Sequence, residues 1–282
     1  MAARMGRVAV VGHVEWITFA VVDRVPGAGD IAQAAETWGG AGGGGGVAAQ
    51  QLVKLAGACD FFTALGDDDV GRRSAAELTQ AAVAVFAAGR EEPTRQGLCL
   101  IDEARERTII TLGRRLEPKG SDDLPWERLE DTDAVYVTAG DIDALHHARA
   151  ARVMVVSSRH LDVLAASGIR ADAVVGSARD PSERYDPRAL ASAPPSLVVL
   201  TEGAAGGRFV TADGREGRYE PAPIPGPIVD TYGSGDSFQA GLAWALGEGI
   251  DAEKAVEVAA RCGAAALTGH GPANGQLTAA DL

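Results

Sequence analysis

One segment of the sequence combines residue types that suit the transfer of a phosphoryl group. Residues Asp230–Phe238 read DTYGSGDSF, and a small-residue run, Gly233–Gly235, lets the backbone turn tightly and bring its N–H groups close to an anion. A helical segment, Ser237–Leu246, follows, so the positive end of its dipole would point at the same anion. Asp236 stands where a base would accept the proton of an attacking hydroxyl. The alternative is that Asp236 only caps the helix.

Other residues with chemical potential are scattered. The five histidines, which show no metal-ligand spacing, are His13, His146, His147, His160 and His270. Among them His13 is placed to lie near a substrate. The three cysteines form no close pair, which predicts reduced, buried thiols. Arg107, Arg114 and Arg115 lie in or just after a predicted hairpin, where one could meet a phosphorylated substrate or a nucleotide; the alternative is a solvated charged face.

The chain is strongly acidic. It has 282 residues, a formal net charge of −13 and a pI of about 4.8. An acidic surface repels polyphosphate backbones, so we expect no nucleic-acid partner. A bound nucleoside triphosphate would need its positive field from a metal ion and from backbone dipoles. No apolar run is long enough for a membrane span, which needs about 18 residues, or for a signal peptide. We therefore expect a cytoplasmic protein with no membrane partner.

Short β-branched runs recur along the chain and predict buried strands of a parallel sheet. They are Val8–Val11, Phe61–Leu65, Ala134–Val137, Val153–Val156, Ala173–Val175 and Leu197–Leu200. Alanine-rich segments of helical length are Gly71–Ala88, Ile142–Ala151, His160–Ser167 and Ala252–Leu267. This alternation predicts an α/β domain whose ligands bind beyond the carboxyl ends of the strands.

Two stretches interrupt that alternation. Trp16–Trp38 has alternating apolar positions and a Pro26-Gly27 turn, and Gln96–Leu112 predicts two strands around a charged turn. Neither suits a crossover helix. Both suit a small β-sheet that projects from the core as a lid, over roughly residues 13–40 and 95–115.

The segment Asp230–Ala243, DTYGSGDSFQAGLA, resembles the C-terminal signature of the ribokinase/PfkB family of carbohydrate kinases. The resemblance implies a three-layer ribokinase-like fold, a mostly parallel central sheet flanked by helices with a projecting β-sheet lid, in a single domain over residues 1–282. It also implies that Asp236 deprotonates the substrate hydroxyl. The amides of Gly233, Ser234 and Gly235 would hold the transferring phosphate.

A glycine run near the N-terminus extends this resemblance. Gly42–Leu55, GGGGGVAAQQLVKL, resembles the family's N-terminal glycine motif and helix. This implies that Gly42 and Gly43 approach the sugar, and the spacing to Gly66-Asp67 favours them over Gly39-Gly40. A flexible linker is disfavoured by the helical pattern that follows. A dinucleotide-binding pattern is disfavoured because no strand leads straight into the run.

The region that resembles the family's nucleotide site lies in the second half. Leu197–Gly206 is similar to the strand and loop that approach ATP, and Thr201, Gly203 and Gly206 match the positions that line the nucleotide. Thr201 could instead satisfy a turn at a strand end.

Two further positions match an Asn-x-x-Glu motif near magnesium and the phosphates, namely Ser177 and Asp180. The Asp180 carboxylate suits Mg²⁺, although a surface aspartate is the alternative. The positions that match a monovalent-cation site of some members are Asp230, Tyr232, Ala266, Gly269 and Gly271. Only Asp230 offers a side chain for that ion, which would be K⁺.

The substrate end departs from the family pattern. Where many members have an Asn and an Asp that grip sugar hydroxyls, this chain has Glu15 and Ile17, and Val47 replaces the Asn that ends the glycine motif. Fewer hydroxyl contacts predict a substrate with fewer hydroxyls there, or one held differently. We expect Glu15 and Trp16 to shape the acceptor pocket; packing of Trp16 on the core is the alternative.

Together these features predict an ATP-dependent, Mg²⁺-using kinase that phosphorylates a hydroxyl of a sugar or a sugar-like molecule. Two other functions stay open. One is a nucleoside or vitamin-precursor kinase of the same superfamily, and the other is a non-catalytic sensor on the same scaffold. A homodimer through the lid sheet would hide its exposed face and edges.

Overall fold

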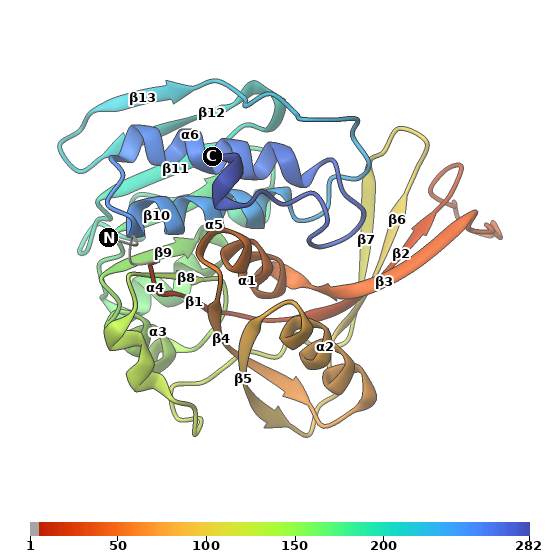
Figure 1. Ribbon diagram of the computed structural model, residues 1–282, viewed down its shortest axis with the longest axis horizontal. Helices are drawn as coiled ribbons and strands as arrows, with labels where there is room; N and C mark the ends of the chain where they lie inside the picture. The colour runs from red at the N-terminus through yellow and green to blue at the C-terminus, as the bar shows by residue number, and fades with distance from the viewer. Residues whose placement is uncertain (1–5) are drawn as a thin grey trace.

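A nine-stranded sheet forms the centre of the molecule (Figure 1). The structure is a computed structural model that describes residues 6–282. The strand order is β13-β12-β11-β10-β9-β8-β1-β4-β5. Within this order, each strand from β11 across to β5 is parallel to its neighbours in that stretch. The strands are β1 Val8–Val11, β4 Cys59–Gly66, β5 Val83–Arg90, β8 Ala134–Val137, β9 Val153–Ser157, β10 Ala173–Ser177, β11 Leu197–Thr201, β12 Gly207–Thr211 and β13 Glu216–Tyr219. The antiparallel hairpin β12–β13 completes one edge.

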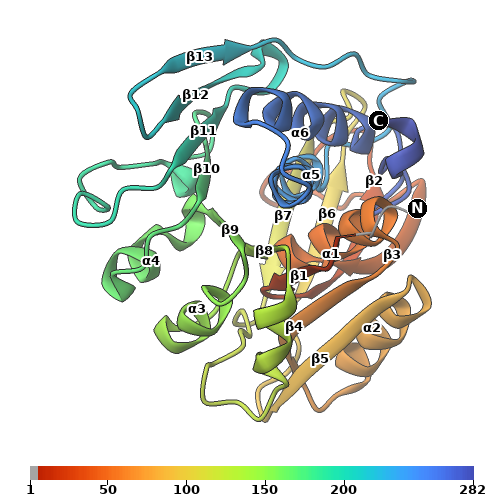
Figure 2. The same ribbon diagram turned by 60° about the vertical axis from the view of Figure 1, so that its left-hand side comes forward.

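Helices cover both faces of this sheet (Figure 2). One face packs against α1 Gly43–Ala56, α2 Asp69–Gln80, α5 Ser234–Gly247 and α6 Ala252–Ala266, and the other against α3 Ile142–Ala148 and α4 Leu161–Ser167. Successive side chains along a strand point to opposite faces of the sheet, so each strand contributes to a hydrophobic core on both faces. Val8 and Val10 join the α5–α6 side, whereas Ala9 and Val11 face the α3–α4 side. The three-layer fold is thus confirmed.

A separate four-stranded sheet projects from this body (Figure 1). Its order is β3-β2-β6-β7, with β2 Glu15–Val21, β3 Glu36–Gly42, β6 Gln96–Ile101 and β7 Arg107–Leu112. The two stretches that were expected to form a lid do form this sheet. Its inner face buries Ile17 and Phe19 against Tyr232 and Val47. The Tyr232 ring meets the Phe19 ring edge-on at 5.1 Å, so the sheet packs directly on the Asp230–Phe238 segment.

One predicted helix is wrong in part. Gly71–Ala88 was expected to be helical throughout, but α2 ends at Gln80 and β5 begins at Val83. Ala82 closes the turn between them with a left-handed φ of 64°. Parallel pairing of Val85 with Phe61 beside a buried sheet outweighs the helix propensity of the alanines. Smaller differences concern α3, which ends at Ala148, and α4, which follows a short 3₁₀ turn at residues 158–160.

Within residues 6–282, we find no helix that combines the length and the apolar character needed to cross a lipid bilayer.

Candidate active site

Asp236 lies in the first turn of α5, at the carboxyl edge of the central sheet. The N-cap of α5 is Gly233, which adopts a left-handed φ of 76°, and no side chain caps the helix. Asp236 is therefore not the N-cap residue. By contrast, α2 and α6 begin at aspartates whose carboxylates accept a backbone N–H, Asp68 and Asp251. The first amides of α5 are left free of any side-chain cap, as an anion-binding turn requires.

The carboxyl group of Asp236 has a raised pKa. Burial raises it to about 6, the negative charge of Glu183 adds to this effect, and the positive charges of Arg159 and Arg107 oppose it. Arg107 reaches this turn from the lid strand β7, and its guanidinium donates to the carbonyl of Thr231. The lid and the Asp236 turn are thus in direct contact.

The glycines that begin α1 face Asp236. A Cβ atom on Gly44 would come within 3.0 Å of Asp236 Oδ1, 2.9 Å of Thr138 Oγ1 and 3.5 Å of His13 Cε1. Gly44 therefore has no room for a side chain, and Asp236 and His13 flank it. Sequence analysis selected Gly42 and Gly43 from this run; the role of Gly44 depends on contacts that only the fold creates.

Gly42 and Gly43 contact the Asp230–Phe238 segment from the other side. The Gly43 N–H donates to Tyr232 Oη at 2.8 Å in a buried hydrogen bond, and Gly43 has a φ of 74°. A Cβ on Gly42 would lie 2.4 Å from the same Tyr232 oxygen. Both glycines are required by this close approach, and Tyr232 joins the start of α1 to the turn before α5.

Glu15 lies in a buried charged cluster near this glycine run. Its Oε1 is 3.2 Å from His13 Nε2 and 3.4 Å from Arg95 Nη1. Burial alone would raise the pKa of Glu15, but the hydrogen bond with His13 and the charges of His13, Arg95 and Arg115 outweigh it and hold the pKa below its ordinary value. Burial lowers the pKa of His13. Glu15 is therefore charged at neutral pH, and the predicted His13 and Glu15 are brought together.

The other substrate-side residues divide between the two faces of β2. Ile17 points inward with Val47, and both are almost fully buried beside Tyr232. Trp16 points to the opposite face, where the Arg73 guanidinium stacks 3.8 Å from its ring centroid and Gly39 lies close beneath it. The side chains of Trp16 and Glu15 therefore lie on opposite faces of β2, and the structure does not bring them together.

The residues expected to line the nucleotide meet at the ends of β10 and β11. Ser177 pairs with Thr201 across these strands. The Thr201 hydroxyl donates to the Gly176 carbonyl at 3.3 Å, which is the turn-satisfying contact that was the alternative for this residue. Gly203 and Gly206 follow with left-handed φ values of 64° and 74°.

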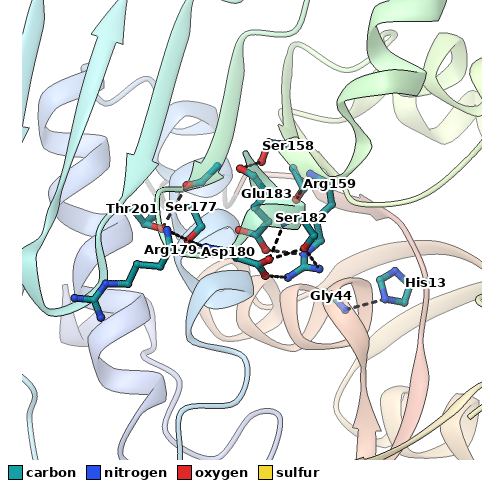
Figure 3. A network of polar contacts seen from close by, with 12 residues as sticks. His13, Gly44, Ser158, Arg159, Ser177, Arg179, Asp180, Ser182, Glu183 and Thr201 are labelled. Atoms are coloured by element: carbon teal, nitrogen blue, oxygen red, sulfur yellow. Dashed lines mark hydrogen bonds and ion pairs between the residues drawn. The ribbon is translucent and has the colours of Figure 1, made fainter. Parts of the chain in front are cut away.

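Arg159, which the sequence patterns did not indicate, lies beside Asp180, Ser182 and Glu183 (Figure 3). Arg159, just after β9, forms ion pairs with Asp180 and with Glu183, and it also hydrogen-bonds Ser182. Although burial raises the pKa of Asp180, the bonds from Ser182 and Arg159 lower it below its ordinary value. These ion pairs could not be predicted from the residue types alone. Arg159 follows β9, whereas Asp180 and Glu183 follow β10, and the pairing of the two strands brings these distant positions together.

Asp180 offers a carboxylate that fits a magnesium ion, but it is already paired with Arg159. Within the part of the chain that the structure describes, no group of three or more His, Cys, Asp or Glu residues could hold a metal by itself. Proteins usually bind Mg²⁺ through one or two carboxylates together with substrate phosphates, and Asp180 offers one carboxylate.

Asp230 is fully buried, and its two oxygens accept the N–H groups of Tyr232 at 2.8 Å and Gly271 at 2.9 Å. Burial raises the pKa of Asp230. Its carboxylate thus ties the turn before α5 to the loop that contains Gly269 and Gly271. Whether that loop also holds K⁺ stays a prediction.

Comparison with protein families shows the family of this chain. The family model described as pfkB family carbohydrate kinase matches residues 5–185 and 156–279. The chain belongs to the pfkB family of carbohydrate kinases. It is accordingly a phosphotransferase that uses an alcohol group as the acceptor, of the ribokinase-related type of sugar kinase.

Individual relatives agree along nearly the whole chain. An ATP-dependent ribose-1-phosphate kinase of Halopiger xanaduensis is 28% identical over 92% of this chain and 91% of its own length. Among solved structures, the ribokinase of Thermotoga maritima shares 18% identity with a TM-score of 0.78, covering 98% of this chain and 97% of that one. The Arabidopsis thaliana ribokinase, solved with ribose and ATP, shares 20% identity with a TM-score of 0.75, covering 98% and 96%. These structural likenesses establish the ribokinase-like fold.

Proposed function

We propose that this carbohydrate kinase transfers the γ-phosphate of ATP to a hydroxyl of a sugar, with Asp236 as the base. The hydroxyl oxygen forms a bond to the γ-phosphorus while the bond from that phosphorus to the β–γ bridging oxygen breaks. The hydroxyl proton passes to the Asp236 carboxylate, and ADP leaves. The amides of Gly233, Ser234 and Gly235 face the developing charge on the transferring group.

The observation that supports this mechanism most directly is the close approach of Gly44 to Asp236. The carboxylate faces a glycine that has no room for a side chain, beside a helix start that no side chain caps. A hydroxyl next to Asp236 would therefore also lie next to the free amides of α5.

On the donor side, we expect the ATP phosphates to lie between this turn and the Ser177, Thr201, Gly203 and Gly206 loops. Mg²⁺ would neutralise phosphate charge, with Asp180 as its protein ligand. Arg159, which pairs with Asp180, would then lie beside the same phosphates. K⁺ at the Asp230 loop is proposed only as an accessory ion.

The mechanism is tested with the variant Asp236→Asn. ADP formation is measured with ATP, Mg²⁺ and a panel of sugars, sugar phosphates and nucleosides. We expect kcat to fall by about 10²–10⁴-fold, the usual contribution of a general base. Asp251→Asn is the matched control, because Asp251 is the exposed N-cap of α6 and asparagine caps equally well. Near-normal turnover by Asp236→Asn would remove Asp236 as the base.

The same panel separates the remaining alternatives. A nucleoside or a vitamin precursor as the best acceptor would identify a different branch of the superfamily. Binding of sugar and ATP without turnover of any acceptor would identify a sensor. The Halopiger relative is described as acting on ribose 1-phosphate, so phosphorylated pentoses belong in the panel.

We also propose a homodimer through the lid. All six residues of β7 are exposed, including the apolar Ile109, Ile110 and Leu112. Contact with a second copy would cover this apolar strand and its free edge.

A further inference from the structure

We propose that the acceptor is a sugar that already bears a phosphate group, and that Arg115 and Arg95 bind this group at the base of the lid. The inference rests on the proposed phosphorylation of a hydroxyl at Asp236. It adds the charge class of the acceptor and the residues that select it.

Strand pairing brings the charged residues to one end of the lid sheet. Glu15 pairs with Gly42, the first glycine of the substrate motif, and Trp16 pairs with Gln96. Gln96 in turn pairs with Leu112. Glu15, Arg95 and the residues after Leu112 therefore leave the sheet at the same end, beside the acceptor glycines. A Cβ on Gly113 would lie 4.0 Å from the Arg95 Cα, which shows how close these segments run.

The cluster contains polar atoms that lack partners. Nδ1 of His13 and Nε of Arg95 are both buried and form no hydrogen bond within residues 6–282. His13 is only 7% exposed. Burying such atoms unpaired is costly, about 1–3 kcal/mol each, so their presence beside a substrate motif indicates groups that a ligand completes. Arg Nε can only donate, which calls for an acceptor on the ligand.

Arg115 adds a second positive charge beside Glu15, which already pairs with Arg95. It is partly buried, and it forms no ion pair or hydrogen bond with any residue that the structure describes. Its charge lowers the pKa values of His13, Glu15 and His160, in line with the course of the chain after Gly113, which runs beside Arg95. Glu15 already pairs with Arg95 and His13. In a chain with a formal net charge of −13, a partly buried arginine without an ion pair is unexpected.

An anionic acceptor resolves this imbalance. Because Gly44 is flanked by Asp236 on one side and His13 on the other, a sugar with one hydroxyl at Asp236 presents its far end to His13 and the arginines. A neutral sugar would leave Arg115 without a counter-charge, whereas the planar guanidinium matches a phosphate with two parallel hydrogen bonds. Glu15 holds Arg95 in place, and His13 Nδ1 is left for a hydroxyl of the sugar.

The test compares Arg115→Gln with Arg114→Gln. Arg114 is the adjacent arginine, and it is exposed. Initial rates are measured with ATP and ribose, ribose 1-phosphate, ribose 5-phosphate or gluconate. We expect the wild type to use a sugar phosphate best. Arg115→Gln should raise KM for that sugar phosphate about 10- to 100-fold, as for a lost charged hydrogen-bond pair, with kcat and the KM for ATP nearly unchanged. Arg114→Gln should behave as the wild type.

Arg115→Lys separates loss of charge from loss of fold. It keeps the positive charge, so it should recover part of the sugar-phosphate affinity, and all variants should unfold at nearly the wild-type temperature. A preference for ribose or gluconate, or an unchanged KM in Arg115→Gln, would overturn the inference while Asp236→Asn still tests the base. If the wild type phosphorylates none of the acceptors in the full panel, the proposed function itself fails.

Discussion

Asp236 is buried rather than a surface aspartate, and its environment suits the base that we propose. Burial and the charge of Glu183 raise its pKa to about 6, and Arg159 and Arg107 limit the rise. A carboxylate with a pKa of about 6 is still ionised at neutral pH, yet it holds a proton better than an ordinary aspartate. Proton transfer is most efficient when the pKa of the base lies near the working pH.

The raised pKa of Asp236 predicts a pH dependence of turnover. The base must be ionised, so kcat should fall as the pH decreases through about 6 and should be constant above it, with about a tenfold loss per pH unit at the acid end. The measurement is kcat at saturating ATP between pH 4.5 and 8.5. A slowly reacting neutral sugar is the preferred acceptor, because its own charge does not change in this range. An acid limb near pH 4, the value of an ordinary aspartate, would contradict the assignment.

Sequence patterns identified the residues of this site that are adjacent along the chain. The Gly233–Asp236 turn and the Gly42–Gly43 pair are local motifs, so their spacing is visible without a structure. Thr138 and Arg159 gave no such signal. Each lies at the end of a different strand, and only the parallel order β1-β8-β9-β10 brings them near Asp236. Trp16 illustrates the reverse case, because the period of two in β2 turns it to the face opposite Glu15.

At the scale of elements, the start of α1 and the turn before α5 behave as one unit. Tyr232 Oη accepts the Gly43 N–H, and Asp230 fixes the Tyr232 backbone and the Gly271 loop. Gly43 is therefore held by the same segment that contains Asp236, the proposed base. This arrangement keeps the acceptor and Asp236 in register with each other.

Removing that link should affect the acceptor more than the nucleotide. Tyr232→Phe deletes the buried hydrogen bond and leaves the Gly43 N–H without a partner, at a cost of about 1–3 kcal/mol. We expect KM for the acceptor to rise about tenfold while KM for ATP changes less than twofold. Tyr185→Phe, on the α3–α4 side, is the matched control. Equal changes in both KM values, or none, would argue against this role.

The strands and helices themselves show where sequence reasoning fails. Apolar runs predicted the central strands well, since a buried parallel strand leaves a continuous apolar signature. The edge strand β5 was assigned to a helix, because Val83–Arg90 is alanine-rich and only half buried. The pairing of β5 with β4, which decides its conformation, involves a neighbour that composition does not specify.

At the scale of the whole molecule, the lid is both a wall of the site and an exposed surface. Its inner face packs on Tyr232 and Val47, and Arg107 reaches the Thr231 carbonyl. Its far strand, β7, presents Ile110 with 48% of its surface exposed. The inner face of the lid is held by these contacts, whereas its outer strand, β7, is exposed and apolar. That outer strand is suited to pairing with a second copy of the chain.

The proposed dimer predicts that a charge on β7 separates the subunits. Ile110→Lys should convert a dimer into a monomer at micromolar concentration, because a lysine in the contact would be desolvated. Ile224→Lys is the control, since Ile224 is also exposed, at 40%, but lies outside the lid. Sedimentation velocity distinguishes the species. A wild type that is monomeric at all concentrations would refute the dimer.

The strand order of the lid also has a consequence for how the chain folds. Strands β2 and β3 are made early, but the parallel partner of β2 is β6, which follows only after α1, β4, α2 and β5. Contacts between distant parts of a chain form slowly, because a long loop must close first. The lid therefore cannot be completed until the chain has been made as far as β6, beyond the α1–β4–β5 unit. The end of the lid that bears Glu15, Arg95 and Arg115 is therefore formed only when β6 joins β2.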